Sequence, residues 1–339
     1  MSVQISTAMS VKVSTELSVQ ISITVSAQIC TAVSVHFSIA MMVQLNTTLC
    51  EMLSTAVNVK FSTALSLQVS TSMNLQVSTA VSVQNSTSLS VQISSVMSVK
   101  FSIALSLQVR ITMSVQVSTA LCVQFSTAVS VKVCIAVSVQ VSTVVNFQFS
   151  RAVSVQICTT VSVQFSTALS VQFNTVLSVQ GSTALSVNFN TALNLQVSKA
   201  VSVQFITVLS VQVSTAVSVQ FNTELSVQVS KALSVQFNTV LSVQVSTVVS
   251  VQVSTAVSVQ VSRALIANIS KAMSVQISTA MSVEFNISVS VQVSISESLQ
   301  INTAVSVRIS RAVNLQFSTI ISVQVSTAVN VQFNTALSV

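Results

Sequence analysis

The residues that could do acid–base or metal chemistry are few and scattered along this 339-residue chain. It has one histidine, His36, five glutamates and no aspartate. A catalytic triad or a carboxylate pair needs such groups at matched positions, and a metal centre needs several ligands together. The sequence therefore predicts no enzymatic activity, no catalytic or cofactor-binding residue and no metal site.

The five cysteines are equally scattered and stand where the surrounding pattern has serine. They are odd in number and unevenly spaced: Cys30, Cys50, Cys122, Cys134 and Cys158. Disulfide frameworks and zinc sites show even numbers or fixed short spacings. We interpret these cysteines as single replacements of serine, and we expect no cofactor.

Hydroxyl groups are abundant, but no base accompanies them, so an activated nucleophile is not expected. A phosphate-binding loop needs several glycines, and the chain has only Gly181. The net charge of +7 comes from twelve cations placed one at a time, with no cluster denser than Arg308 and Arg311 and no Trp or Tyr. These features predict neither a nucleic-acid partner nor a small-molecule substrate.

All of these residues lie in an eight-residue unit that repeats without insertion or deletion. Its consensus is [V/I/F]-[S/N]-T-A-[V/L/M]-S-V-Q, and the first complete copy begins at Ile5. About 42 copies follow one another. We therefore expect a single continuous octapeptide-repeat array over residues 1–339, without separate caps or linkers.

The eight columns of the aligned copies predict which residues face inward. The fifth column is apolar except at Glu297, the seventh except at Glu51, and the first except at Asn85 and Gly181. The third and eighth columns hold eleven of the twelve cations. Because a buried unpaired cation is costly, we predict that the first, fifth and seventh columns form the interior and that the third and eighth face solvent.

Three single residues could be functional sites or simple replacements. Glu51 and Glu297 fall in columns predicted to be inward, and we interpret them as defects that bend the strand outward or stay protonated. His36 stands in an outward column that usually holds Gln, and we interpret it as a surface replacement.

The column pattern predicts strands. From the fifth residue to the first of the next copy, as in Leu169 to Phe173, the predicted order is in, out, in, out, in, which is typical of a half-buried strand. Apolar spacings of four, two and two do not lie on one helical stripe. The remaining Ser or Asn, Thr and Ala are predicted to form a corner.

Strands and corners repeated without a hairpin signal predict an all-β fold, a parallel β-solenoid built from the octads. Of fourteen Phe in the first column, ten lie in every second copy, counted from Ile5. That bias favours two octads, or 16 residues, per coil, with Phe stacked along one edge. Three octads per coil is the alternative, and duplication of a two-copy DNA segment would also explain the bias.

We expect a repetitive structural or surface-fibre protein whose partner is itself, through end-to-end or lateral assembly. The outward Thr column resembles ice-binding proteins in general plan, although those typically carry paired Thr on one strand. Repeated Ser and Gln resemble curli-type amyloid fibres, without the glycine and asparagine positions of that repeat. Ice binding and functional amyloid are therefore further alternatives.

The runner-up is a translated tandem DNA repeat without a selected function. Serine in the second column gives way to Asn, Cys, Arg and Ile, each one nucleotide from a serine codon, as point mutation of a 24-base repeat would produce.

The sequence predicts neither a signal peptide nor a transmembrane segment, so localisation stays open. If the chain is a fragment of an exported protein, an extracellular or cell-surface place is expected. The Asn-X-Ser/Thr sequons at Asn46, Asn85, Asn268 and Asn286 matter only in that case.

Overall fold

The fold is all-β, as predicted. A computed structural model describes the backbone of residues 2–338 and the side chains of residues 2–335. All of the described residues belong to one extended element, β1 (Ser2–Ser338), and none of them is helical. Contacts divide the chain into two units, Met1–Ser170 and Val171–Val339, and each is considered by itself.

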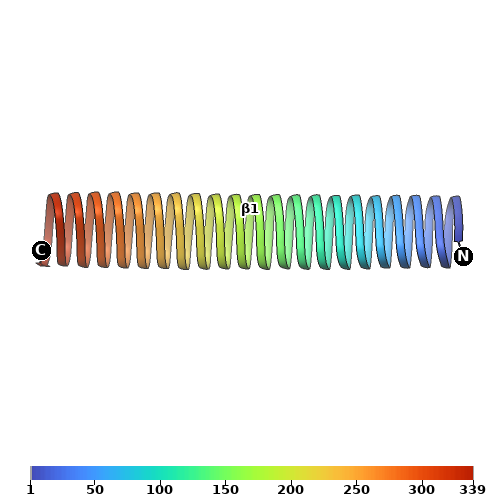
Figure 1. Ribbon diagram of the computed structural model, residues 1–339, viewed down its shortest axis with the longest axis horizontal. Helices are drawn as coiled ribbons and strands as arrows, with labels where there is room; N and C mark the ends of the chain where they lie inside the picture. Colours follow the sequence, from blue (N-terminus) through green and yellow to red (C-terminus); the bar gives the residue numbers. More distant parts are fainter. Residues whose placement is uncertain (1, 339) are drawn as a thin grey trace. The chain divides into compact units, whose positions relative to one another are not determined.

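Within each unit the ribbon of β1 winds into successive coils that lie side by side (Figure 1). Side-chain hydrogen bonds between neighbouring coils give the period. In the first unit the Gln28 amide donates to the Gln44 carbonyl over 3.1 Å, and in the second unit Gln244 donates to Gln260 over 3.1 Å. Both pairs are separated by 16 residues, the length of two octads.

The first, fourth and seventh columns form the interior. In one copy of the second unit, Ala216 is 4% exposed, Val219 is 0% exposed and the following Phe221 is 1% exposed. The fifth-column Val217 between them is 46% exposed. The prediction was right for the first and seventh columns and wrong for the fifth, because the alanine of the predicted corner is buried in its place.

The physical reason for this correction is that outward residues come in consecutive pairs within each copy. Second- and third-column residues such as Ser214 and Thr215 are exposed, and Val217 and Ser218 follow a single buried alanine on the outer surface. Two consecutive outward residues on each side of Ala216 break the simple alternation on which the prediction depended. Hydrophobicity alone misplaced the fifth column, since apolar side chains also occupy much of a protein surface.

The coil turns without left-handed backbone. No described residue has a positive φ, Gly181 included. The change of direction is therefore spread over ordinary extended conformations, which explains why a chain with one glycine and no proline can wind in this way.

Aromatic side chains strengthen the interior along the first column. Phe173 and Phe189 stack with ring centroids 4.9 Å apart, and Phe205 and Phe221 stack at 4.8 Å. Each pair is separated by 16 residues, the spacing of the hydrogen-bonded glutamines. Such pairs contribute about 0.5–1.5 kcal/mol beyond their buried area.

Some polar replacements in the buried fourth column find partners in the backbone, whereas the buried hydroxyls of Thr48, Ser288 and Ser296 have none among the described residues. The Thr24 hydroxyl donates to the carbonyl of Ser26 over 3.1 Å, and the Thr112 hydroxyl donates to the carbonyl of Ser114 over 3.3 Å. A hydrogen bond to a carbonyl two residues further on allows threonine to replace alanine in the interior.

Candidate functional site

The residues singled out for chemistry are not brought together. His36 is half-buried, and Glu297 is exposed because the fifth column faces outward, which corrects its predicted inward place. The five cysteines are exposed and free. The described residues contain no group of three or more His, Cys, Asp or Glu that could hold a metal ion.

The cations lie where the sequence predicted. All twelve Lys and Arg are exposed, including the third-column Lys199 and the eighth-column Lys60. The outward assignment of these two columns is confirmed.

Glu51 is a buried carboxyl group in the seventh column, 2% exposed. Within the described part of the chain, neither of its carboxyl oxygens has a hydrogen-bond partner. Burial raises the pKa of Glu51 from 4.5 to about 8, and the nearby Thr48 hydroxyl opposes that rise. Near neutral pH Glu51 is therefore mostly protonated, in agreement with one of the two structural interpretations given from sequence.

Glu224 is a second buried carboxyl group, and the sequence did not single it out. It takes the place of alanine in the fourth column and is 6% exposed. Burial raises the pKa of Glu224 to about 8, while the backbone near Asn222 and Thr223 lowers it in part. Sequence reasoning missed this residue because the fourth column was assigned to a corner rather than to the interior.

Asn85 forms a polar cluster inside the first unit. Its amide nitrogen donates to the hydroxyl groups of Ser72 and Ser88, and these two hydroxyls lie 2.9 Å apart. All three residues are buried. The serines compensate the loss of an apolar first-column side chain, so the cluster is structural, and the sequon at Asn85 is not on the surface.

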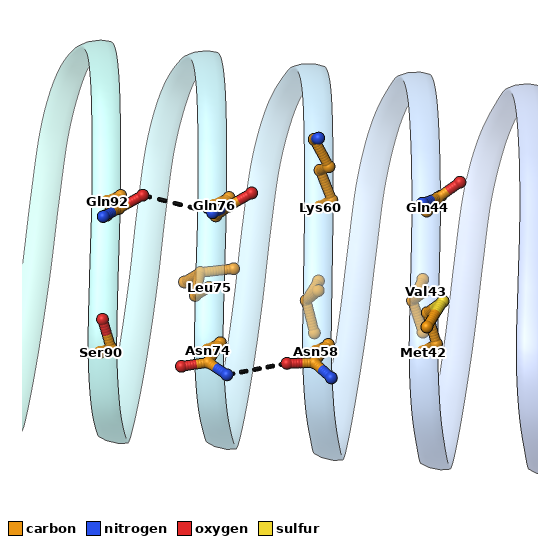
Figure 2. Close-up of a pocket in the computed structure, with 11 residues that line it drawn as sticks. Met42, Val43, Gln44, Asn58, Lys60, Asn74, Leu75, Gln76, Ser90 and Gln92 are labelled. Carbon is orange, nitrogen blue, oxygen red and sulfur yellow. Dashed lines mark hydrogen bonds between the residues drawn. The ribbon is translucent and has the colours of Figure 1, made fainter.

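Glutamine ladders cover the outer surface at the eighth column. In one ladder of the second unit the amide nitrogen of each member before the last donates to the carbonyl oxygen 16 residues further on, over 3.0–3.4 Å. The members are Gln180, Gln196, Gln212, Gln228, Gln244, Gln260, Gln276 and Gln292. A shorter ladder in the first unit is interrupted by Lys60, which stands between Gln44 and Gln76 (Figure 2).

Asparagine pairs follow the same period in the opposite direction. The Asn74 amide donates back to the Asn58 carbonyl over 2.8 Å beside Lys60 (Figure 2), and in the second unit Asn190 donates to Asn174 over 3.0 Å. The surface around Lys60 has a shallow groove of about 370 Å³, lined by amide side chains such as Asn58 and Asn74 and by apolar side chains such as Met42 and Leu75. The amides of this groove offer hydrogen-bond donors and acceptors, and Lys60 adds a charged donor.

The outward third and fifth columns form two different faces in the second unit. The first, called here the Thr face, contains every second residue of the third column from Thr175 to Thr335. These residues are Thr except at Lys271 and Ile287. The other, called the cation face, starts from the alternate residues from Thr183 to Thr327. Each face also includes the fourth- and fifth-column residues that follow. Four cations lie on the cation face: Lys199, Lys231, Arg263 and Arg311.

An apolar groove of about 460 Å³ runs along the Thr face across several coils. Its walls are third-column and fifth-column side chains, and small fourth-column side chains such as Ala256 and Ala272 lie between them. Glu224 also lines this groove. The walls are Thr239, Leu241, Thr255, Val257, Lys271, Met273 and Ile287.

Two broader comparisons complete the description. Among the described residues there is no helix long and apolar enough to span a membrane. Comparison with known proteins finds no family model, no curated protein and no solved structure that matches the chain.

Proposed function

We propose that this chain is a parallel β-solenoid with two octads per coil, and that it serves as a non-enzymatic structural or surface-fibre protein. One observation carries the proposal. Glutamine amides on the surface, asparagine amides on the surface and stacked phenylalanine rings pair with partners 16 residues away, as in Gln212 with Gln228 and Phe221 with Phe237. A coil of three octads would pair residues 24 apart, which none of these contacts does.

A structural role follows from what such a stack offers. Every coil repeats the same inward and outward columns, so each stabilises its neighbours through equivalent contacts, and stability grows with the number of coils. Parallel strands about 4.8 Å apart resist unfolding and mechanical extension through many backbone hydrogen bonds. Copies with the same coils are natural partners for one another, so the proposed partner is the chain itself.

Electron microscopy and diffraction from oriented fibres test this function. Concentrated protein should form elongated particles or filaments, with strong diffraction along the fibre axis at about 4.8 Å, since the strands run across that axis. Compact globular particles, or a disordered circular dichroism spectrum, would remove the proposal.

The runner-up, a translated DNA repeat without a selected function, makes a different prediction at the codon level. Selection for the fold should give an excess of silent over replacing changes in the first, fourth and seventh columns, whose side chains are buried. Equal rates in these columns and in the exposed ones would favour the runner-up.

Ice binding is a second candidate, favoured by the Thr face. Exposed Thr and aliphatic side chains alternate there in a regular array, with Thr255 and Val257 on one coil and Thr239 and Leu241 on the coil before. Thermal hysteresis at high protein concentration is expected if this face binds ice, and freezing at the equilibrium point would exclude it.

A further inference from the structure

The apolar groove on the Thr face is matched by a ridge on the same face. Fifth-column side chains project from it, with Leu241 46% exposed, Val257 41% and Met273 58%. Beside them the fourth-column side chains form the floor of the groove: Ala256 and Ala272, which are 6% and 8% exposed, and the larger Val240 and Glu224. A surface with an apolar ridge and an adjacent apolar groove can bury both against a copy of itself.

We propose that the Thr face of the unit Val171–Val339 binds the Thr face of a second copy of this chain, so that the fifth-column ridge of each copy lies over the fourth-column floor of the other. The proposal rests on the solenoid of the preceding section and names the face through which copies pair. A two-fold axis along the direction in which the coils stack relates the two copies, so both contribute the same patch.

The period of the face favours a second copy over other partners. Its Thr and aliphatic side chains recur once per coil, at the spacing of adjacent strands, about 4.8 Å. An unrelated surface would match that spacing at one or two coils and then lose register. A second copy has the same spacing, so the fifth-column side chains of the two copies stay in register from coil to coil.

The distribution of cations also favours pairing through the Thr face rather than through the cation face. In the second unit Lys271 is the single third-column cation on the Thr face, whereas the cation face carries four. Two cation faces brought together would place like charges opposite one another, which opposes association. The Thr face brings together two nearly uncharged apolar surfaces.

The area of the face sets the strength of pairing. About ten coils at about 4.8 Å, each presenting three residues over about 10 Å, give about 500 Å² per copy and about 1,000 Å² per pair. That area lies at the lower limit for a specific protein interface. The expected complex is therefore a reversible dimer whose population depends on protein concentration.

Matched double variants of the full chain test the proposal. L241K/V257K adds two charges to the Thr face, and L233K/V249K adds the same two charges to the cation face one octad earlier. All four side chains are at least 41% exposed, so both variants should fold. Sedimentation velocity over a range of concentrations should show a dissociation constant at least about tenfold higher for L241K/V257K than for wild type and for L233K/V249K.

Three outcomes would overturn the pairing. They are equal dissociation constants for the two double variants, a greater loss of association in the cation-face variant, and a wild-type chain that stays monomeric at every concentration. Circular dichroism of the same samples separates this failure from failure of the solenoid. A β spectrum with no effect on pairing removes the inference alone, whereas a disordered spectrum in wild type removes the proposed function as well.

Discussion

At the scale of single residues, the neighbours Val219 and Gln220 test which columns face inward and which face outward. Val219 is 0% exposed, and Gln220 is exposed in its ladder. Val219→Lys buries an unpaired ammonium group and should lower the free energy of unfolding by about 4 kcal/mol or more, whereas Gln220→Lys should change it by about 0.5 kcal/mol. Denaturant unfolding of the two variants measures both effects, and similar losses would contradict the assignment.

The two buried carboxyl groups predict how stability depends on pH. The pKa of Glu51 is about 8 in the folded chain and 4.5 as its ordinary value. Between these values the folded state holds the proton and the unfolded state has lost it, so rising pH favours unfolding. The free energy of unfolding should fall by about 1.4 kcal/mol per pH unit from Glu51, and Glu224 should act in the same direction.

Glu51→Gln keeps the shape of the side chain but removes the carboxyl group that titrates. The Glu51→Gln/Glu224→Gln variant should therefore lose this slope and be more stable than wild type at pH 8, while the two chains converge toward pH 4.5. Urea unfolding at several pH values provides the measurement. A wild-type slope that survives both substitutions would mean that other groups cause it.

At the scale of one octad, hydrophobicity alone suggests that the fifth column is buried and the fourth exposed, and the structure has the reverse. Ala216 is 4% exposed and Val217 is 46% exposed. Ala216→Leu should overpack the interior and cost about 1–3 kcal/mol, whereas Val217→Lys should cost about 0.5 kcal/mol or less. Thermal or urea unfolding compares the two. A larger loss of stability from Val217→Lys than from Ala216→Leu would mean that the fifth column, and not the fourth, lies in the interior.

The same octad shows how far sequence reasoning reached. The all-β class, the inward first and seventh columns and the outward cations could be predicted, because burying charge and exposing every apolar column are both costly. The predicted alternation of inward and outward residues was wrongly extended to the fifth column, which faces outward together with the sixth. Glu224 was missed for the same reason, since a carboxyl group stands out only when its column is known to be buried.

The difference between the Thr and cation faces emerges only when the copies are divided into two alternating sets. In a list of octads the third column contains a mixture of Thr, Ile, Lys and Arg. Only when residues 16 apart are placed in adjacent coils does it separate into a threonine-rich and a cation-rich set in the second unit. The groove beside Ala256 depends on how small and large side chains alternate across that face, which periodicity alone does not give.

At the scale of the whole molecule, the central claim is that residues 16 apart occupy adjacent coils. Strands about 4.8 Å apart place equivalent Cα atoms within the range that a disulfide bond requires. The exposed second-column serines Ser246, Ser254, Ser262 and Ser270 provide pairs for testing this spacing. The five natural cysteines are exposed and can first be replaced by serine.

Disulfide formation in three double variants, followed by mass spectrometry under mild oxidation, tests the claim most directly. Ser246→Cys/Ser262→Cys, 16 residues apart, should form its intramolecular disulfide rapidly and nearly completely. Ser246→Cys/Ser254→Cys and Ser246→Cys/Ser270→Cys, with separations of 8 and 24, should stay reduced within one chain. Preferential closure of the 24-residue pair would contradict the two-octad coil, and equal closure of all three would contradict an ordered stack.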